Sequence, residues 1–147
     1  MGILVLCTGN SCRSQIAEAF LRRHAGPAFV VHSAGTEPAG EIHPLVYTVM
    51  AEKGLDLSDQ HPKDYRDLLG RIPVHTLITV CDGAAEACPA VWPGVVVRLH
   101  WSTDDPAAFI GGEKETLEEF RRVRDELEGR VLSFCEALPT SEPRADS

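Results

Sequence analysis

The stretch GILVLCTGNSCRSQIAEAFLRRH, residues 2–24, decides how this chain folds. It begins with a short, continuous apolar run, Ile3 to Leu6, which is typical of a strand in the middle of a parallel sheet. A polar loop follows, and from Ser14 to His24 the apolar residues fall on one face of a predicted helix. Gly26 and Pro27 end that helix. The stretch therefore predicts a buried strand, a loop and an amphipathic helix in direct succession.

Strands and helices continue to alternate along the chain. We predict strands over residues 29–33, 75–80 and 95–99, helices over 44–53 and 114–138, and a short helix near 65–69 within the ambiguous polar stretch 56–71. Such alternation predicts a single-domain α/β fold of three layers, α/β/α, around a four-stranded parallel sheet. Ligands of these sheets bind beyond the carboxyl ends of the strands. Residue 7, residue 81 and the acidic segment after residue 100 are therefore expected to meet at one edge.

Composition narrows the classes of function. The chain has 147 residues, of which 44% are hydrophobic and 24% charged, and its formal charge is −8 from 14 basic and 22 acidic residues. These values exclude a largely disordered or fibrous chain, and the negative charge argues against a general nucleic-acid binder. No signal peptide or membrane segment is visible, so we expect a cytoplasmic monomer with no membrane partner.

The five cysteines are an odd number in a chain without a secretion signal, which argues against a disulfide framework. Cys12 is interpreted as structural or as a bystander that can pair with Cys7 under oxidation, and Cys135 as part of the core. A zinc module built from Cys7, Cys12, Cys81 and Cys88 is an alternative, although their spacings do not match common zinc sites. The histidines show no metal-ligand spacing, and His32, His75 and His100 are interpreted as structural.

The chemistry is concentrated in the loop CTGNSCRS, residues 7–14. Backbone N–H groups at a helix N-terminus bind oxyanions, and the loop curls most readily where Gly9 and Asn10 tolerate a left-handed backbone. Arg13 supplies a planar fork for two oxygens, and the same field favours a thiolate at Cys7, to which Ser14 can donate a hydrogen bond. The predicted substrate-binding residues are Thr8, Gly9, Asn10, Ser11, Cys12, Arg13 and Ser14.

The spacing Cys-x5-Arg is the phosphate-binding signature of cysteine-dependent phosphatases. The string CTGNSCRS resembles the low-molecular-weight tyrosine phosphatase superfamily, and within it the thioredoxin-coupled arsenate reductases. The similarity continues through SAG at 33–35, VC at 80–81, CP at 88–89, HW at 100–101, DDP at 104–106 and FRRVRD at 120–125. It implies a low-molecular-weight phosphatase-like catalytic domain over residues 1–138 and a flexible tail over 139–147.

The resemblance also implies a reaction sequence. Cys7 attacks arsenate, Asp105 protonates the departing oxygen, Cys81 attacks Cys7 to release arsenite, and Cys88 then attacks Cys81. Thioredoxin would reduce the final disulfide with electrons from NADPH through thioredoxin reductase, and no cofactor would be bound. Asp104 competes with Asp105 for the acid role, and either carboxylate would otherwise merely cap a turn.

Other readings stay open at this point. A low-molecular-weight tyrosine phosphatase would use Cys7, Arg13 and Asp105 with water as the second nucleophile, and weak phosphatase activity is expected of a reductase too. A non-enzymatic thiol-binding protein is a further alternative. Some arsenate reductases bind a potassium ion near the loop. Asn10, Glu18 and Ser33 match three of its ligands, with Asp64 a candidate for the fourth.

Overall fold

The sheet consists of four parallel strands in the order β2-β1-β3-β4. A computed structural model describes residues 1–80 and 92–138 of the chain. The strands are β1 (Gly2–Cys7), β2 (Val30–Gly35), β3 (Thr76–Thr79) and β4 (Val97–His100). Cys7 pairs with Gly35, and Leu6 pairs with Thr79. The loop that follows β1 therefore leaves the sheet between the carboxyl ends of its two neighbours.

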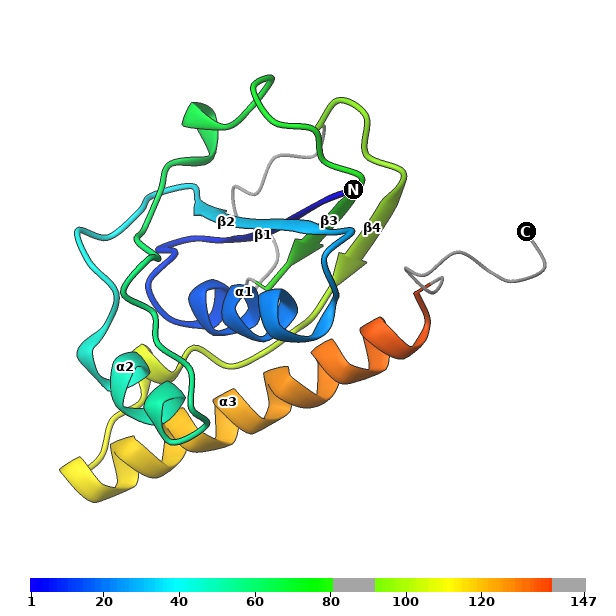
Figure 1. The fold of residues 1–147 in the computed structure, drawn as a ribbon. Coiled ribbons are helices and arrows are strands. Elements are labelled where there is room, and N and C mark those ends of the chain that lie inside the picture. The colour runs from blue at the N-terminus through cyan, green and yellow to red at the C-terminus, as the bar shows by residue number, and fades with distance from the viewer. Residues whose placement is uncertain (81–91, 139–147) are drawn as a thin grey trace.

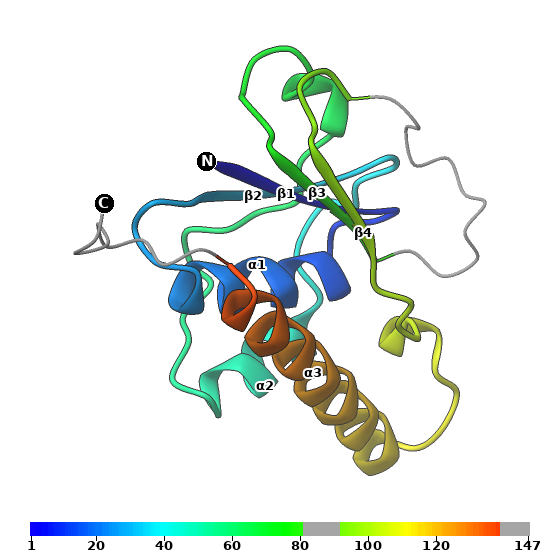
Figure 2. The ribbon, with the colours of Figure 1, turned by 90° about the vertical axis from the view of Figure 1, so that its right-hand side faces the viewer.

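Three α-helices pack on one face of the sheet (Figures 1 and 2). They are α1 (Arg13–His24), α2 (Pro44–Ala51) and α3 (Glu113–Glu136). Pro44 begins α2, where its fixed φ suits a first helical residue, and the ring of His43 accepts a hydrogen bond from the Leu45 amide. The apolar stripe of α3 lies against α1 and α2, which gives the molecule its main core.

Side chains alternate across β1 and so divide the core in two. Ile3 and Val5 join the large cluster with α1, α2 and α3, whereas Leu4 and Leu6 pack on the opposite face with Leu77. All four of these β1 side chains are fully buried. Residues buried on both faces explain why the run reads as continuously apolar rather than alternating.

The fold class predicted from the sequence is confirmed, with a difference on the second face. Within residues 1–80 and 92–138 that face carries loops and the 3-10 turn η1 (Tyr65–Asp67) instead of an α-helix. The stretch does not continue as an α-helix because Gly70, shortly after the turn, takes a left-handed conformation at φ 79°, and Pro73 follows. The predicted tail, 139–147, lies outside the described residues.

Element boundaries differ from the predicted ones by one or two residues at most ends. The strand predicted over 95–99 forms at Val97–His100, and the last helix runs over Glu113–Glu136 instead of 114–138. A second 3-10 turn, η2 (Pro106–Ala108), stands between β4 and α3. None of the helices in the described ranges is both long enough and apolar enough to cross a membrane.

Candidate active site

The loop after β1 is held from outside by its carbonyl groups. The carbonyls of Cys7, Thr8, Gly9 and Ser11 accept hydrogen bonds from the amides of Thr36, Glu37, Ala39 and His43, at 2.9–3.1 Å. The Asn10 carbonyl accepts from the side chain of Gln15 at 2.9 Å. In a trans peptide the N–H points opposite to the C=O, so the amides of residues 8–12 face the inside of the loop. The segment 36–43 thus builds an oxyanion cradle.

The end of β2 at Gly35 packs closely against the backbone of the loop. A Cβ placed on Gly35 would lie 2.4 Å from the Thr8 carbonyl oxygen and 3.2 Å from the Asn10 amide nitrogen, so only glycine fits there. Asn10 has φ 52°, the left-handed region that the sequence suggested for it. Gly9 does not adopt positive φ, so that expectation was wrong for this residue.

Cys7 ends β1 and begins the loop, and the residue is 3% exposed. The Asn10 amide donates to it at 3.1 Å, and the Ser14 hydroxyl lies 2.9 Å away. Burial raises the pKa of the Cys7 thiol, while the hydrogen bonds from Ser14 and Asn10 and the charge of Arg13 lower it. The net direction is upward, contrary to the lowered pKa that the sequence suggested, because desolvation outweighs the donors.

A buried hydrogen-bond chain determines the direction of the Ser14 hydroxyl. The Lys63 amide donates to Asn10 Oδ1 at 2.8 Å, which fixes the amide so that Asn10 Nδ2 donates to both Ser14 Oγ (2.7 Å) and Ser33 Oγ (2.9 Å). Ser33 in turn donates to Glu18 Oε1 at 2.6 Å. Since Ser14 accepts from Asn10, its own proton is available for Cys7 Sγ. The network therefore aims a donor at the nucleophile.

Arg13 lies at the first position of α1 and is 7% exposed. Its Nη1 donates to the carbonyls of Val80 at 3.1 Å and Thr103 at 2.9 Å, and its Nη2 stands 3.8 Å from Asp105 Oδ2. One guanidinium thus connects the loop, the end of β3 and the acidic segment that the sequence expected to meet at this edge.

The structure separates the two acid candidates. Asp105 faces Arg13 with one oxygen and accepts from the Ala107 amide with the other at 3.0 Å. Asp104 is turned away to α3, where it pairs with Arg122 at 3.0 Å, and its side chain is 77% exposed. Asp105 is therefore the carboxyl group placed to serve the Cys7 loop, and it also caps η2.

The residues matched to a potassium site do not fit that ion in this chain. Glu18, 1% exposed, is already paired with Arg22 at 2.6 Å and with Ser33. Asn10 Oδ1 accepts from the Lys63 amide, and the Asp64 carboxylate is paired with Arg66. A guanidinium, rather than an added cation, neutralises the buried carboxylate.

The remaining cysteines divide into described and undescribed positions. Cys81 and Cys88, the predicted relay thiols, lie outside the described residues. Cys12 is buried, and burial raises its pKa to about 12, which agrees with a bystander. Cys135 is half-buried and packs against the main core. In residues 1–80 and 92–138 no group of three or more His, Cys, Asp or Glu side chains is arranged to hold a metal ion.

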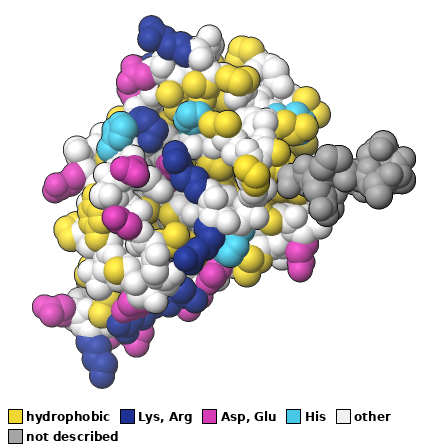
Figure 3. Space-filling view, viewed as in Figure 1, with side chains coloured by type: hydrophobic (Ala, Val, Ile, Leu, Met, Phe, Trp, Pro, Cys, Tyr) yellow, Lys and Arg dark blue, Asp and Glu magenta, His cyan; other side chains and the backbone are white. Residues whose placement is uncertain are grey.

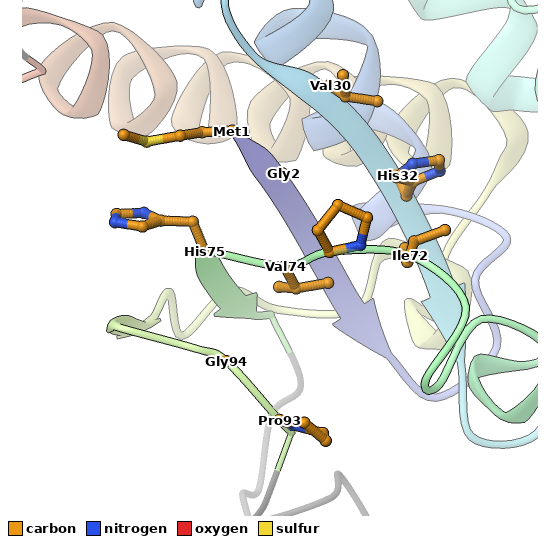
Figure 4. Close-up of a pocket in the computed structure, with 10 residues that line it drawn as sticks. Met1, Gly2, Val30, His32, Ile72, Val74, His75, Pro93 and Gly94 are labelled. Atoms are coloured by element: carbon orange, nitrogen blue, oxygen red, sulfur yellow. The ribbon is translucent and has the colours of Figure 1, made fainter.

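Two of the histidines, His32 and His75, lie away from the Cys7 loop. A cavity of about 410 Å³ lies at the opposite end of β1. Figure 4 shows side chains that line it, among them Val30, His32, Val74 and His75. His75 is hydrogen-bonded to Thr76, and His100 to Thr79 at 2.6 Å. These contacts agree with structural roles.

On the face in Figure 3, acidic and basic side chains are interspersed rather than gathered into a basic patch.

Comparison with known sequences identifies the class of protein. A family model described as low molecular weight phosphotyrosine protein phosphatase matches residues 2–143, so the chain belongs to that family. Within it, an arsenate reductase of Bacillus licheniformis is 42% identical over 137 residues, which cover 91% of this chain and 94% of that protein. An arsenate reductase of Bacillus subtilis is also 42% identical, over 135 residues, with the same coverage.

Solved structures give the same result at the level of the fold. An arsenate reductase in the phosphate binding state superposes with a TM-score of 0.79 at 28% identity, covering 94% of this chain and 98% of that one. An arsenate reductase from Archaeoglobus fulgidus has a TM-score of 0.73 at 27% identity, covering 91% and 98%. Wzb of Vibrio vulnificus, in complex with benzylphosphonate, shares the fold at 18% identity.

Sequence reasoning missed two contributors to the site. The segment 36–43 acts through its backbone amides, and backbone donors leave no mark on residue type. Arg22, which neutralises Glu18, stands four residues after it, a spacing that was available as a helical ion-pair signal.

Proposed function

We propose that this chain is an arsenate reductase that uses Cys7 as its nucleophile and is regenerated by thioredoxin. The observation that carries the proposal is the Cys7 sulfur held between the Asn10 amide and the Ser14 hydroxyl, at the start of a loop with inward-facing amides. The arsenate reductases that are 42% identical over nine-tenths of the chain support arsenate as the oxyanion.

In the first step the Cys7 thiolate bonds to arsenic. One hydroxyl group of arsenate takes the proton of Asp105 and leaves as water, while the inward amides and Arg13 hold the remaining oxygens. Arg13, tied to Asp105 at 3.8 Å, keeps the acid beside the bound anion.

In the second step the Cys81 thiolate attacks the Cys7 sulfur. A disulfide forms, the sulfur–arsenic bond breaks, and its electron pair reduces arsenic(V) to arsenic(III), which leaves as arsenite. The residue before Cys81 supports this proposal, because Val80 gives its carbonyl to Arg13 at 3.1 Å. Cys88 then attacks Cys81, frees the Cys7 thiolate and leaves a Cys81–Cys88 disulfide for thioredoxin to reduce.

The proposed thiol relay also indicates the cellular compartment in which the protein functions. Thioredoxin-dependent turnover needs a reducing compartment, so we place the chain in the cytoplasm.

Phosphate ester hydrolysis is the second candidate. The family of the chain is that of phosphotyrosine protein phosphatases, and the same Cys7, Arg13 and Asp105 can transfer a phosphoryl group to sulfur and then to water. A reductase with this loop is expected to retain weak activity of that kind.

The experiment follows arsenate-dependent NADPH oxidation with thioredoxin and thioredoxin reductase, beside hydrolysis of 4-nitrophenyl phosphate. Cys81→Ser and Cys88→Ser should each abolish arsenate reduction, because neither disulfide can then be passed on, while hydrolysis survives. Cys135→Ser is the matched control and should retain both activities. Full reductase turnover in either relay variant would contradict the proposal, and hydrolysis alone in the unmodified chain would favour the second candidate.

A further inference from the structure

The acidic segment Trp101–Asp105 has no helix or strand of its own, and three arginines hold it. From the loop side, Arg13 donates to the Thr103 carbonyl at 2.9 Å. From the helix side, Arg130 donates to the Ser102 carbonyl at 3.3 Å, and Arg122 pairs with the Asp104 carboxylate at 3.0 Å. The direction of Asp105 therefore depends on α3 as well as on the Cys7 loop.

The two α3 arginines are fixed by a carboxylate between them. Arg122, Glu126 and Arg130 follow one another at four-residue intervals, so they share one face of the helix. Glu126 lies 3.3 Å from Arg122 Nη1 and 3.9 Å from Arg130 Nε. This face of α3, which we call the acid-loop brace, consists of Arg122, Glu126 and Arg130.

Arg122 is the central charge of the brace. Besides Asp104 and Glu126 it pairs with Glu119 at 2.7 Å, so a single cation stands among three carboxylates. Loss of the guanidinium would leave those carboxylates facing one another, and like charges repel. Asp104 is the one carboxylate of the three that is on a segment without secondary structure, so it is the one that would move.

We propose that Arg122 is a positioning residue for the general acid: by anchoring Asp104 to α3, it turns the neighbouring Asp105 toward Arg13 and the Cys7 loop. The inference rests on the proposed function, because it takes Asp105 as the proton donor. Arg122 and Asp104 are substantially exposed, at 48% and 77%, and such pairs contribute little to folding stability. The effect of the pair is therefore expected in proton donation and not in stability.

Leaving-group dependence measures proton donation directly. Phenol needs a proton as it departs from phosphate, whereas 4-nitrophenol leaves readily as its anion. The value of kcat/KM covers the steps up to that departure, so the ratio of kcat/KM for phenyl phosphate to that for 4-nitrophenyl phosphate reports on the acid. Asp105→Asn provides the reference for an absent acid.

Arg122→Gln should lower this ratio about tenfold, part of the roughly 10²- to 10⁴-fold that a general acid contributes. Arg122→Lys, which keeps the charge, should restore most of it. Asp104→Asn should lower the ratio as well, and the double variant should be no worse than the more affected single one, since both act through the same contact. The thermal unfolding midpoint should stay close to that of the unmodified chain.

Arg121→Gln is the matched control, because Arg121 precedes Arg122 on α3 but pairs with Glu52 and Glu118. It should leave the ratio unchanged. A ratio in Arg122→Gln equal to that in Arg121→Gln, with Asp105→Asn still impaired, overturns the inference alone. An unimpaired Asp105→Asn, or no ester hydrolysis by the unmodified chain, overturns the proposed chemistry of the site together with the inference.

Discussion

At the scale of single residues, the site is organised around the proton of Ser14. Asn10 Nδ2 donates to Ser14 Oγ at 2.7 Å, so the Ser14 hydroxyl can donate its own proton to Cys7 Sγ, which lies 2.9 Å away. The Cys7 thiolate must form against desolvation, and this donor is one of the few groups that oppose it. The reactivity of the sulfur should therefore depend on the Ser14 hydroxyl.

Ser14→Ala should make Cys7 a poorer thiolate. Removal of the hydroxyl raises the pKa of Cys7 further, because a hydrogen bond to the charged form is lost, and such a bond is worth about 1.5–3 kcal/mol. Alkylation of Cys7 by iodoacetamide at neutral pH, followed by mass spectrometry, should slow by about tenfold. Ser133→Ala, on the exposed side of α3, should alkylate like the unmodified chain, and equal rates in both variants would contradict the network.

Residue patterns predicted much of this site, within clear limits. Cys7, Arg13 and Ser14 were predictable because a loop between a buried strand and a helix places them by local geometry alone. The separation of Asp105 from Asp104 was not, since it depends on Arg122, which lies 18 residues further along the chain. The amides of segment 36–43 were invisible for a different reason, because every residue except proline carries the same N–H.

At the scale of elements, α2 and α3 are joined by an ion-pair network at Glu52. Arg121 lies 2.7 Å from this carboxylate, and the nearly buried Arg124 lies 2.6 Å from it while also donating to the Val49 carbonyl at 3.0 Å. The two arginines lower the pKa of Glu52 to about 2. The packing of α3 against α2 thus depends partly on a charged Glu52.

Glu52→Gln should destabilise the chain only where Glu52 is charged. The folded-state pKa lies below the ordinary value of 4.5, so the contribution is fully present above that value and disappears as pH falls toward about 2. Urea unfolding across this pH range should show a stability difference at neutral pH that shrinks through this window. A stability difference that is constant with pH would argue against the charge of Glu52 as its cause.

The alternation of strands and helices in the sequence was sufficient to predict the sheet, but it did not predict what covers the second face of the sheet. Continuous burial of β1 required cover on both sides, and the sequence was interpreted as helix on each. Tyr65, Leu68 and Ile72 provide part of that cover from η1 and the loop around it, because a few apolar side chains suffice over a narrow sheet. Their spacing, i, i+3 and i+7, is also that of an α-helix, so the apolar pattern did not distinguish a single 3-10 turn from an α-helix.

At the scale of the whole molecule, parallel topology brings the chemistry to one edge. The loop after β1, the end of β3 and the segment after β4 meet at Arg13, although residues 13 and 103 are 90 positions apart. A chain of formal charge −8 binds an oxyanion there because amides and Arg13 create a local positive field. The account predicts that this one edge both binds arsenate and reduces it.

A single-turnover experiment tests that claim most directly. The fully reduced chain is mixed with arsenate in the absence of thioredoxin, arsenite is counted, and the disulfides are mapped by non-reducing digestion and mass spectrometry. The account predicts one arsenite per chain together with a Cys81–Cys88 disulfide in the unmodified protein, and a trapped Cys7–Cys81 disulfide in Cys88→Ser. Arsenite formation in Cys7→Ser, or a stoichiometric turnover that leaves Cys81 and Cys88 as free thiols, would contradict it.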